Sequence, residues 1–437
     1  MHQRNTLASV LRFATIAFCL VLSNVAAFGS ADKIVHNFAG PPDGAGPWAG
    51  LITDKAGNFY GTTGGGGLVT CLCGTVFELS PPTSEGGSWT ETILYSFQGL
   101  QNGGHDGLQP NTQLVMDDAG NLFGGTQWGG KNNRGTIYEL SPPAVQGGQW
   151  TESVLYSFVR DGSRGSNAFW LVVGLDRNLY GTTLGGGTGE SCGGGTSNKC
   201  GVVFVLERPS TTGGAWDQHI LHNFGEFEGD SATPLQIAVA PSGSLYGMAG
   251  DGGTAGKGTF FRLSKNHGSW TEEILFDFSG SATHGPTNLT FDPHGNVFAV
   301  TSGGGDPMCQ CGGVVELLRP ATPGGAWSES PVYNFMNGND GSNPFGPLVF
   351  DKAGDLFGTA AHGGDATCQC GAIFELTPPA VSGDIWSETT LHDFVGPKIH
   401  GDGSNVNGGL VFLNGKLYGT TTFGGAKRGG TVFSMVP

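Results

Sequence analysis

Eight of the nine cysteines fall into four close pairs, and paired thiols can form a disulfide or bind a metal ion. The pairs are Cys71/Cys73, Cys192/Cys200, Cys309/Cys311 and Cys368/Cys370. An even number of cysteines favours disulfides in an exported protein. No pair has two further ligands nearby at the spacing of a zinc site. We therefore expect four local disulfides.

The Cys-x-Cys spacing of three of these pairs places a condition on the backbone. In an extended strand the Cα atoms of residues i and i+2 lie about 6.5–7 Å apart, near the upper limit for a disulfide. A turn is therefore required at the central residue of each pair, which is Leu72, Gln310 or Gln369.

An acidic residue recurs along the chain beside glycine, and carboxylates in a ring could bind Ca²⁺ or another hard cation. The residues are Asp43, Asp106, Asp161, Asp230, Asp340 and Asp402, with His284 in place of the acid once. The sequence establishes no cofactor, and calcium is the candidate that this pattern suggests. The simpler explanation, which the sequence favours, is that each Asp fixes a turn next to its glycine.

Two sets of tryptophans differ in their spacing. Trp48, Trp128 and Trp170 are irregular and could stack on a sugar, although the sequence favours core packing for them. Six others are regular, and five of these are followed two places later by Glu. We expect the regular tryptophans to pack between repeats and the glutamates to face water. They are Trp89, Trp150, Trp216, Trp270, Trp327 and Trp386, with Glu91, Glu152, Glu272, Glu329 and Glu388.

Four histidines occupy the same kind of strand as these tryptophans. They are His36, His219, His222 and His392. Because the corresponding segments carry Tyr95 or Tyr156, we interpret these histidines as packing residues rather than as metal ligands.

The elements that position these residues belong to a repeat. A phrase of the form Asn-Leu-Tyr-Gly-Thr-Thr recurs at residues 58–63, 121–124, 178–183, 244–247, 296–299, 355–359 and 416–421. A second phrase, of the form Gly-Thr-Val-Phe-Glu-Leu, follows each, from residues 74–79 to residues 430–433. The third phrase begins at a regular Trp and ends at a Phe.

Each repeat is predicted to hold four short strands. β-Branched and aromatic residues are bounded by Gly, Pro, Asn and Asp, and Asp-x-x-Gly-Asn turns at residues 54–58, 117–121 and 292–296 make tight hairpins. Four-stranded units of about 60 residues, repeated seven times, predict an all-β, seven-bladed β-propeller. Residues 32–437 are expected to form this single domain.

The two ends of the chain share one blade in this scheme. The last repeat stops after its third strand, and residues 33–38 match the fourth strands at residues 221–224 and 391–394. We expect residues 33–38 to complete the seventh blade beside residues 430–435, which would close the ring and remove its open edges.

The combined pattern Leu-Tyr-Gly-Thr-Thr, Gly-Thr-Val-Phe, Leu-Tyr-Ser-Phe and Asp-Gly resembles the GloVer tandem repeat of secreted bacterial proteins. The resemblance covers nearly all of the chain after residue 27. It implies propeller-like repeats in an exported protein. It implies no catalytic residue, because none is established for the family.

Residues 1–27 have the pattern of a signal peptide. Arg4 and Arg12 flank the start of an apolar run, Phe13 to Leu22, and small residues follow. No later stretch is long enough for a membrane span, so we expect a secreted, extracellular or periplasmic monomer. The net charge is −16, and loss of Arg4 and Arg12 makes it −18, which excludes nucleic acid as a partner.

The sequence favours a non-enzymatic binding protein that presents a loop-rich face to an extracellular glycan or protein. Seven similar repeats contain no unique cluster of acid, base and nucleophile. An alternative is a lyase or hydrolase for extracellular polysaccharide or a lactone, with a cation at the channel mouth near Asp230, His284 and Asp340. A third possibility is a structural surface or matrix repeat protein. Whether the chain is an enzyme stays open.

Overall fold

The computed structural model describes residues 33–84, 86–101, 105–145, 147–159, 162–189, 200–211, 213–279, 283–381, 385–396 and 402–437. The elements bounded within these residues are all β-strands. Within the same ranges, no helix has the length and hydropathy to cross a membrane. The predicted signal peptide lies outside the described residues.

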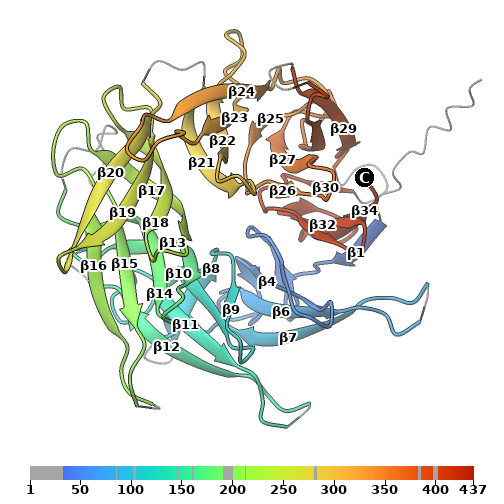
Figure 1. The fold of residues 1–437 in the computed structure, drawn as a ribbon. Helices are drawn as coiled ribbons and strands as arrows, with labels where there is room; N and C mark the ends of the chain where they lie inside the picture. The colour runs from blue at the N-terminus through green and yellow to red at the C-terminus, as the bar shows by residue number, and fades with distance from the viewer. Residues whose placement is uncertain are drawn as a thin grey trace, which may run out of the picture.

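Seven small antiparallel sheets surround a common axis and form a seven-bladed β-propeller, as predicted (Figure 1). Within a blade the strands follow chain order from the axis outward, so that β7, β12, β16, β20, β24 and β29 lie on the outside. Only blade 7 departs from this order, because its outer strand is β1.

The blades contain the following strands. Blade 1 comprises β3 (Ile52–Thr53), β4 (Phe59–Thr63), β6 (Thr75–Ser80) and β7 (Thr90–Ser96). Blade 2 comprises β8 (Gly107–Pro110), β9 (Val115–Met116), β10 (Leu122–Gly129), β11 (Thr136–Ser141) and β12 (Thr151–Ser157). Blade 3 comprises β13 (Ser166–Val173), β14 (Leu179–Gly185), β15 (Val202–Glu207) and β16 (Asp217–Asn223). Blade 4 comprises β17 (Ser231–Val239), β18 (Leu245–Gly252), β19 (Thr259–Asn266) and β20 (Ser269–Asp277).

The remaining strands complete the ring. Blade 5 comprises β21 (Thr283–Phe291), β22 (Val297–Gly304), β23 (Gly313–Leu318) and β24 (Ser328–Asn334). Blade 6 comprises β25 (Ser342–Pro344), β26 (Val349–Phe350), β27 (Leu356–His362), β28 (Ala372–Thr377) and β29 (Ser387–Asp393). Blade 7 comprises β31 (Val411–Leu413), β32 (Lys416–Thr421), β34 (Thr431–Met435) and β1 (Lys33–Asn37). Two short pairs stand apart, β2 (Gly44–Ala45) with β5 (Gly65–Gly66) and β30 (Gly403–Ser404) with β33 (Phe423–Gly424).

The first and the last described strands lie side by side. β1 pairs antiparallel with β34, so that Lys33 is opposite Ser434 and Asn37 is opposite Thr431. Phe38, which follows β1, is fully buried, and its N–H donates to the Gly430 carbonyl at 3.1 Å. The outer strand of blade 7 therefore comes from the N-terminal end of the domain.

The predicted hairpin turns are present between first and second strands. Asp54 accepts hydrogen bonds from the N–H of Ala56 and of Asn58 at 2.8 and 2.9 Å, and from the Asn58 side chain at 2.9 Å. Tyr60 Oη donates to the same carboxylate at 3.1 Å. The side chain of the turn Asp thus holds the start of the second strand in place.

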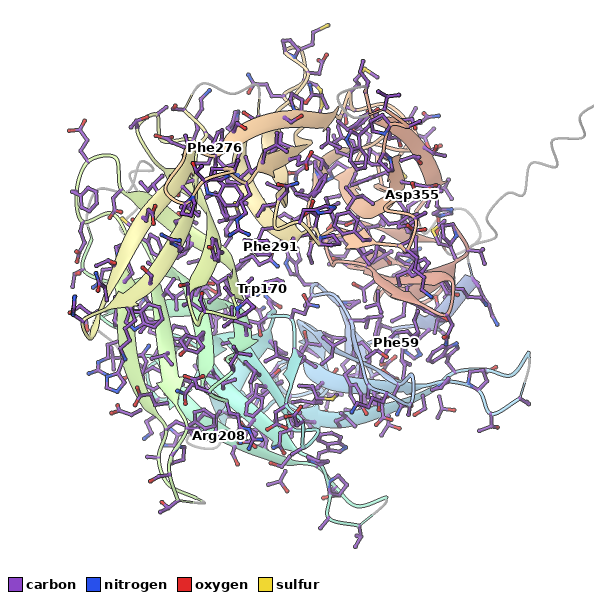
Figure 2. The ribbon with its side chains drawn as sticks, in the orientation of Figure 1. Phe59, Trp170, Arg208, Phe276, Phe291 and Asp355 are labelled. Carbon is purple, nitrogen blue, oxygen red and sulfur yellow. A yellow bond between two sulfur atoms is a disulfide. The ribbon has the colours of Figure 1, made fainter. Side chains whose placement is uncertain are left out.

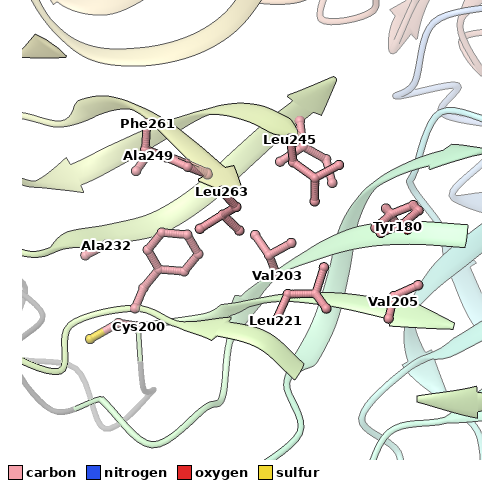
Figure 3. Close-up of a cluster of buried hydrophobic side chains, with 12 residues drawn as sticks. Tyr180, Cys200, Val203, Val205, Leu221, Ala232, Leu245, Ala249, Phe261 and Leu263 are labelled. Carbon is pink, nitrogen blue, oxygen red and sulfur yellow. The ribbon is translucent and has the colours of Figure 1, made fainter. Parts of the chain in front are cut away.

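The hydrophobic core lies between neighbouring blades. Between blades 3 and 4 it contains Val203 and Leu221 from one sheet and Leu245 and Phe261 from the other (Figure 3). The regular tryptophans pack at these boundaries, as predicted. Their aromatic contacts to the preceding blade are Trp89–Tyr418, Trp150–Tyr60, Trp216–Phe123, Trp270–Tyr180, Trp327–Phe260 and Trp386–Phe298.

The glycine of the Tyr-Gly-Thr-Thr phrase is required by a close contact. A Cβ on Gly181 would lie 2.5 Å from the ring of Phe204, which is opposite it on β15. In blade 5 the same register pairs Ala299 with Val315. The larger residue on one strand is thus matched by a smaller one on its neighbour.

The blades are also joined near the axis by threonines of the second strand. The Thr182 hydroxyl donates to the Leu235 carbonyl of blade 4 at 2.7 Å. The Thr420 hydroxyl makes the same contact from blade 7 to Ala49, before β3 of blade 1, at 3.2 Å. These bonds satisfy buried carbonyls that no strand pairing reaches.

Candidate binding cleft between blades 4 and 5

The carboxylates of the predicted acidic ring each hold their own loop. Asp106 accepts hydrogen bonds from the N–H of Gln98 and of Gly107, both at 2.6 Å. Similar pairs of backbone bonds are made by Asp43, Asp230, Asp340 and Asp402. Asp161 lies outside the described residues. Each of the five described carboxylates stands at a separate blade boundary and fixes the chain as it enters the next blade.

His284 is placed differently from these acids. It lies within β21, opposite Gly303 of β22, and not in the loop before the strand. Burial and the nearby charge of Lys257 lower its pKa. Among the described residues, the clusters with metal-ligand geometry include neither His284 nor Asp340. The structure therefore does not bring Asp230, His284 and Asp340 to one cation.

The expectation that the outer-strand glutamates face water is wrong. The side chain of Glu91 is 15% exposed and that of Glu272 is 5% exposed. Each points toward the loop that enters its own blade, where it approaches the loop Asp and a His or Tyr of the preceding outer strand. Residues two apart on a strand share a face, so Glu272 lies on the face of Trp270, which turns toward the neighbouring blade rather than toward water.

The axis of the propeller leaves little free space. A cavity of about 40 Å³ is lined by residues at or before the first strands, including Trp48, Phe169, Trp170 and Asn288. This hollow has room for about one water molecule and does not enclose a sugar, so that stacking of a sugar on Trp170 or on Trp48, which is 40% exposed, stays a prediction. Trp128 lies elsewhere, on β10 opposite Leu108, and is 39% exposed.

Three of the predicted disulfides are formed. Cys71–Cys73, Cys309–Cys311 and Cys368–Cys370 have Cα atoms 5.1, 5.2 and 5.2 Å apart. The required turns are present, because φ is 55° at Leu72, 52° at Gln310 and 51° at Gln369.

The fourth predicted pair, Cys192–Cys200, is described at one end alone. Cys200 is disulfide-bonded and 2% exposed, and it belongs to the core between blades 3 and 4 (Figure 3). Cys192 lies outside the described residues. The oxidised state predicted for Cys200 is therefore present, whereas its pairing with Cys192 stays a prediction.

Arg208 lies at the boundary between blades 2 and 3, on the face of the ring that carries the first hairpin turn of each blade. The N–H of Arg208 donates to Asn178 Oδ1 at 2.9 Å, and its guanidinium donates to Asp117 Oδ2 at 3.0 Å (Figure 2). The guanidinium also lies 5.7 and 5.2 Å from the ring centres of Phe123 and Trp216. Its charge is thus matched by the turn Asp of the preceding blade.

Arg319 has the same position at the boundary between blades 4 and 5. Its N–H donates to Asn296 Oδ1 at 3.0 Å. The place of Asp117 is taken by Ala240, whose N–H bonds to the carbonyl of Ser244 as that of Asp117 bonds to Asn121. Among the residues that the structure describes, no carboxylate forms an ion pair with Arg319 within 4.0 Å. Its charge is therefore unmatched.

A second arginine enters the same region from blade 4. Arg262 is opposite Tyr246, whereas Glu78 and Glu139 have this position in blades 1 and 2. Arg262 pairs with Glu273, and its Nε is buried with no hydrogen-bond partner. Burial acts to lower the pKa of Arg262, but bonds to Tyr246 and Glu273 outweigh it and raise the pKa above its usual value.

These residues line a cleft of about 580 Å³ between the two blades. Its walls include Tyr246, Arg262 and Glu273 of blade 4, and His294, Arg319 and Trp327 of blade 5. A second hollow of about 470 Å³ shares Tyr246, Arg319 and Trp327 and adds Phe291. Both volumes fall within the range of ligand pockets, which combine apolar walls with a few polar groups.

The aromatic walls of the cleft are held by one another. The Tyr246 ring stacks on Phe260 at 5.9 Å and meets the edge of Phe291 at 5.6 Å. Trp327 contacts Phe260 at 5.0 Å. Such walls suit a flat or ring-shaped ligand, and the guanidinium of Arg319, which has no carboxylate partner among the described residues, suits an anion.

Two residues at this cleft depart from the repeat pattern, and these departures could have indicated the cleft from the sequence. Arg262 stands in place of the Glu of the Gly-Thr-Val-Phe-Glu-Leu phrase, and Ala240 stands in place of the Asp of the hairpin turn. That the two deviations meet Arg319 at one boundary requires the fold.

Comparisons with known proteins support the repeat and the fold. The model of the Gloeobacter/Verrucomicrobia repeat matches residues 21–204 and confirms the resemblance of the repeat pattern. None of the curated proteins matches the chain significantly.

Three solved structures resemble the chain at low sequence identity. The first is the extracellular domain of a suspected one-component system from B. thetaiotaomicron, with 13% identity, a TM-score of 0.53, and coverage of 93% of this chain and 41% of that one. PorZ, a surface component of the type-IX secretion system of Porphyromonas gingivalis, has 14% identity, a TM-score of 0.52, and coverage of 92% and 47%. YCF48 from Cyanidioschyzon merolae has 11% identity, a TM-score of 0.50, and coverage of 93% and 99%. This chain therefore spans less than half of the first two proteins, and these likenesses show the fold alone.

Proposed function

We propose that this protein, whose chain carries the Gloeobacter/Verrucomicrobia repeat over residues 21–204, is an exported binding protein that holds an acidic glycan in the cleft between blades 4 and 5. The observation that carries the proposal is the unmatched guanidinium of Arg319 beside the aromatic walls of Tyr246 and Trp327. Export is supported by the apolar leader, and propellers of similar fold occur in an extracellular domain and a surface component.

The chemistry of the cleft favours a sugar that carries a carboxylate. A guanidinium binds a carboxylate through two parallel hydrogen bonds, and the flat faces of Tyr246 and Trp327 can stack on pyranose rings. The chain as a whole is strongly acidic, with a net charge of −16. A short oligosaccharide with few acidic units therefore fits better than a long polyanion, which the remaining surface would repel.

The test compares binding of tri-galacturonate and of neutral cellotriose by calorimetry. We expect Arg319→Ala to weaken tri-galacturonate binding by about 10- to 100-fold. Arg208→Ala, the matched control at the boundary of blades 2 and 3, should leave binding unchanged. Failure of the native protein to prefer the acidic sugar, or equal losses in the two variants, would overturn the proposal.

A charge-restoring variant gives a sharper test. Ala240→Asp recreates the arrangement of Asp117 and Arg208, which the fold already accepts in blade 2. The new carboxylate should occupy Arg319 and abolish binding of the acidic sugar without disturbing the propeller. A variant that binds as tightly as the native protein would show that the unmatched charge has no role.

A further inference from the structure

A set of three polar side chains recurs where one blade meets the next at the outer edge of the ring. The set comprises a Tyr or His of one outer strand, the loop Asp, and the Glu of the next outer strand. In the Tyr version the phenol donates to the Asp, as Tyr95 does to Asp106 at 3.0 Å and Tyr333 does to Asp340 at 3.2 Å. The His version is arranged differently.

In the His version the imidazole faces two carboxylates at similar range. His222 Nε2 lies 3.8 Å from Asp230 Oδ1 and 3.5 Å from Glu272 Oε2. These distances are too long for good hydrogen bonds. They are close to the separation of about 3.3–3.4 Å between ligand atoms that share a tetrahedral Zn²⁺ at 2.0–2.1 Å.

The cluster is buried, and two of its polar atoms have no hydrogen-bond partner. The side chain of Asp230 is 0% exposed and that of Glu272 is 5% exposed. Neither His222 Nε2 nor Glu272 Oε1 has a hydrogen-bond partner. A carboxylate that is more than nine-tenths buried and lacks a partner for one oxygen normally has an explanation, such as a bound ion.

A second copy of the cluster stands where β1 meets blade 1. His36 Nε2 lies 3.6 Å from Asp43 Oδ2 and 3.4 Å from Glu91 Oε2. His36 Nε2 and Glu91 Oε1 also lack hydrogen-bond partners. In both clusters the three ligand atoms lie within 4.8 Å of one another.

We propose that the His222, Asp230 and Glu272 cluster, and its copy at His36, Asp43 and Glu91, each bind a divalent transition-metal ion, for which Zn²⁺ is the probe. One imidazole nitrogen and two carboxylates are ligand types that Zn²⁺ accepts, and three of them leave a fourth tetrahedral position open. Ca²⁺ requires six to eight oxygen ligands, which these clusters do not supply. The ion would join blade 3 to blade 4 in one site and β1 to blade 1 in the other.

The protonation of the clusters sets the conditions for binding. Imidazole and carboxylate groups bind a metal ion in their deprotonated forms. Zn²⁺ should therefore bind more tightly at pH 8 than at pH 6.

The experiment counts bound Zn²⁺ by calorimetry at pH 8, using the full protein after treatment with EDTA. We expect the two described clusters to bind one ion each. His222→Tyr and His36→Tyr should each lose one ion, and both should fold because Tyr has this position in blades 1 and 5. Ca²⁺ should give no heat of binding.

Two further variants make the outcome decisive. Tyr95→His should create a third site with Asp106 and Glu152. His219→Ala removes an exposed histidine that lies 3.3 Å from Asp217 on the same strand as His222, and it should leave the count of bound ions unchanged. A count that is unchanged in His222→Tyr, or one that falls in His219→Ala instead, would overturn the proposal.

Discussion

The ionisation of Glu152 should make the propeller less stable as the pH rises. Glu152 lies at the boundary of blades 1 and 2, near Asp106 of the loop, Tyr95 of β7 and Tyr138 of β11. Its Oε1 has no hydrogen-bond partner. Burial, followed by the charge of Asp106, raises the pKa of Glu152 to about 7 from 4.5.

The sign and size follow from the two protonation states. Because the pKa in the folded state is the higher one, the folded protein binds more protons, and its stability falls as the pH rises from 4.5 to about 7. A full shift corresponds to about 3.4 kcal/mol, at about 1.4 kcal/mol for each pH unit. From pH 5.5 upward the remaining loss is about 2 kcal/mol at most, and partial solvation of Glu152 reduces it to about 1–2 kcal/mol.

The variant Glu152→Gln removes this ionisation while keeping the shape of the side chain. Its free energy of unfolding, measured with urea at pH 5.5 and pH 8.0, should rise relative to the native protein by about 1–2 kcal/mol between these two values. Glu228→Gln, at an exposed position before Asp230, should show no such change. An advantage of Glu152→Gln that is the same at both pH values would refute the reasoning.

Two further predictions concern the packing of the ring. Phe38→Ala should lower the free energy of unfolding, measured with urea, by about 3–5 kcal/mol, because Phe38 at the end of β1 is fully buried against Phe77. Phe227→Ala, at an exposed position, should have no effect. A small loss for Phe38→Ala would show that β1 contributes little to stability. Gly181→Ala should lower the free energy of unfolding by about 1–3 kcal/mol, because the new Cβ forces Phe204 aside. The loss should be smaller in the background of Phe204→Val, which imitates the Ala299 and Val315 pair of blade 5. Equal losses in both backgrounds would contradict the close contact.

The architecture was accessible from the sequence because each blade repeats the same local rules. The Asp-x-x-Gly-Asn turns, the regular tryptophans and the turn at Leu72 each depend on a few neighbouring residues or on a residue type that recurs in register. Seven copies of a weak local pattern make one strong prediction.

The candidate sites were less accessible because they depend on contacts between blades. Strand alternation places Glu272 on the same face as Trp270, but the histidine and the loop that it meets become apparent only in the folded ring. In the same way, nothing in the sequence around Arg319 distinguishes it from other surface arginines. Its lack of a carboxylate partner follows from Ala240, which faces it from the preceding blade. The sequence of a single repeat does not predict which residues of neighbouring blades meet.

The pairing of β1 with β34 also governs when the protein can finish folding during its synthesis. The Ala426 N–H donates to Asn37 Oδ1 at 2.8 Å across 389 positions of the chain. Blade 7 can form only when β1 and β34 are both present. Until β34 has been made, the ring therefore stays an open arc with two unpaired edges.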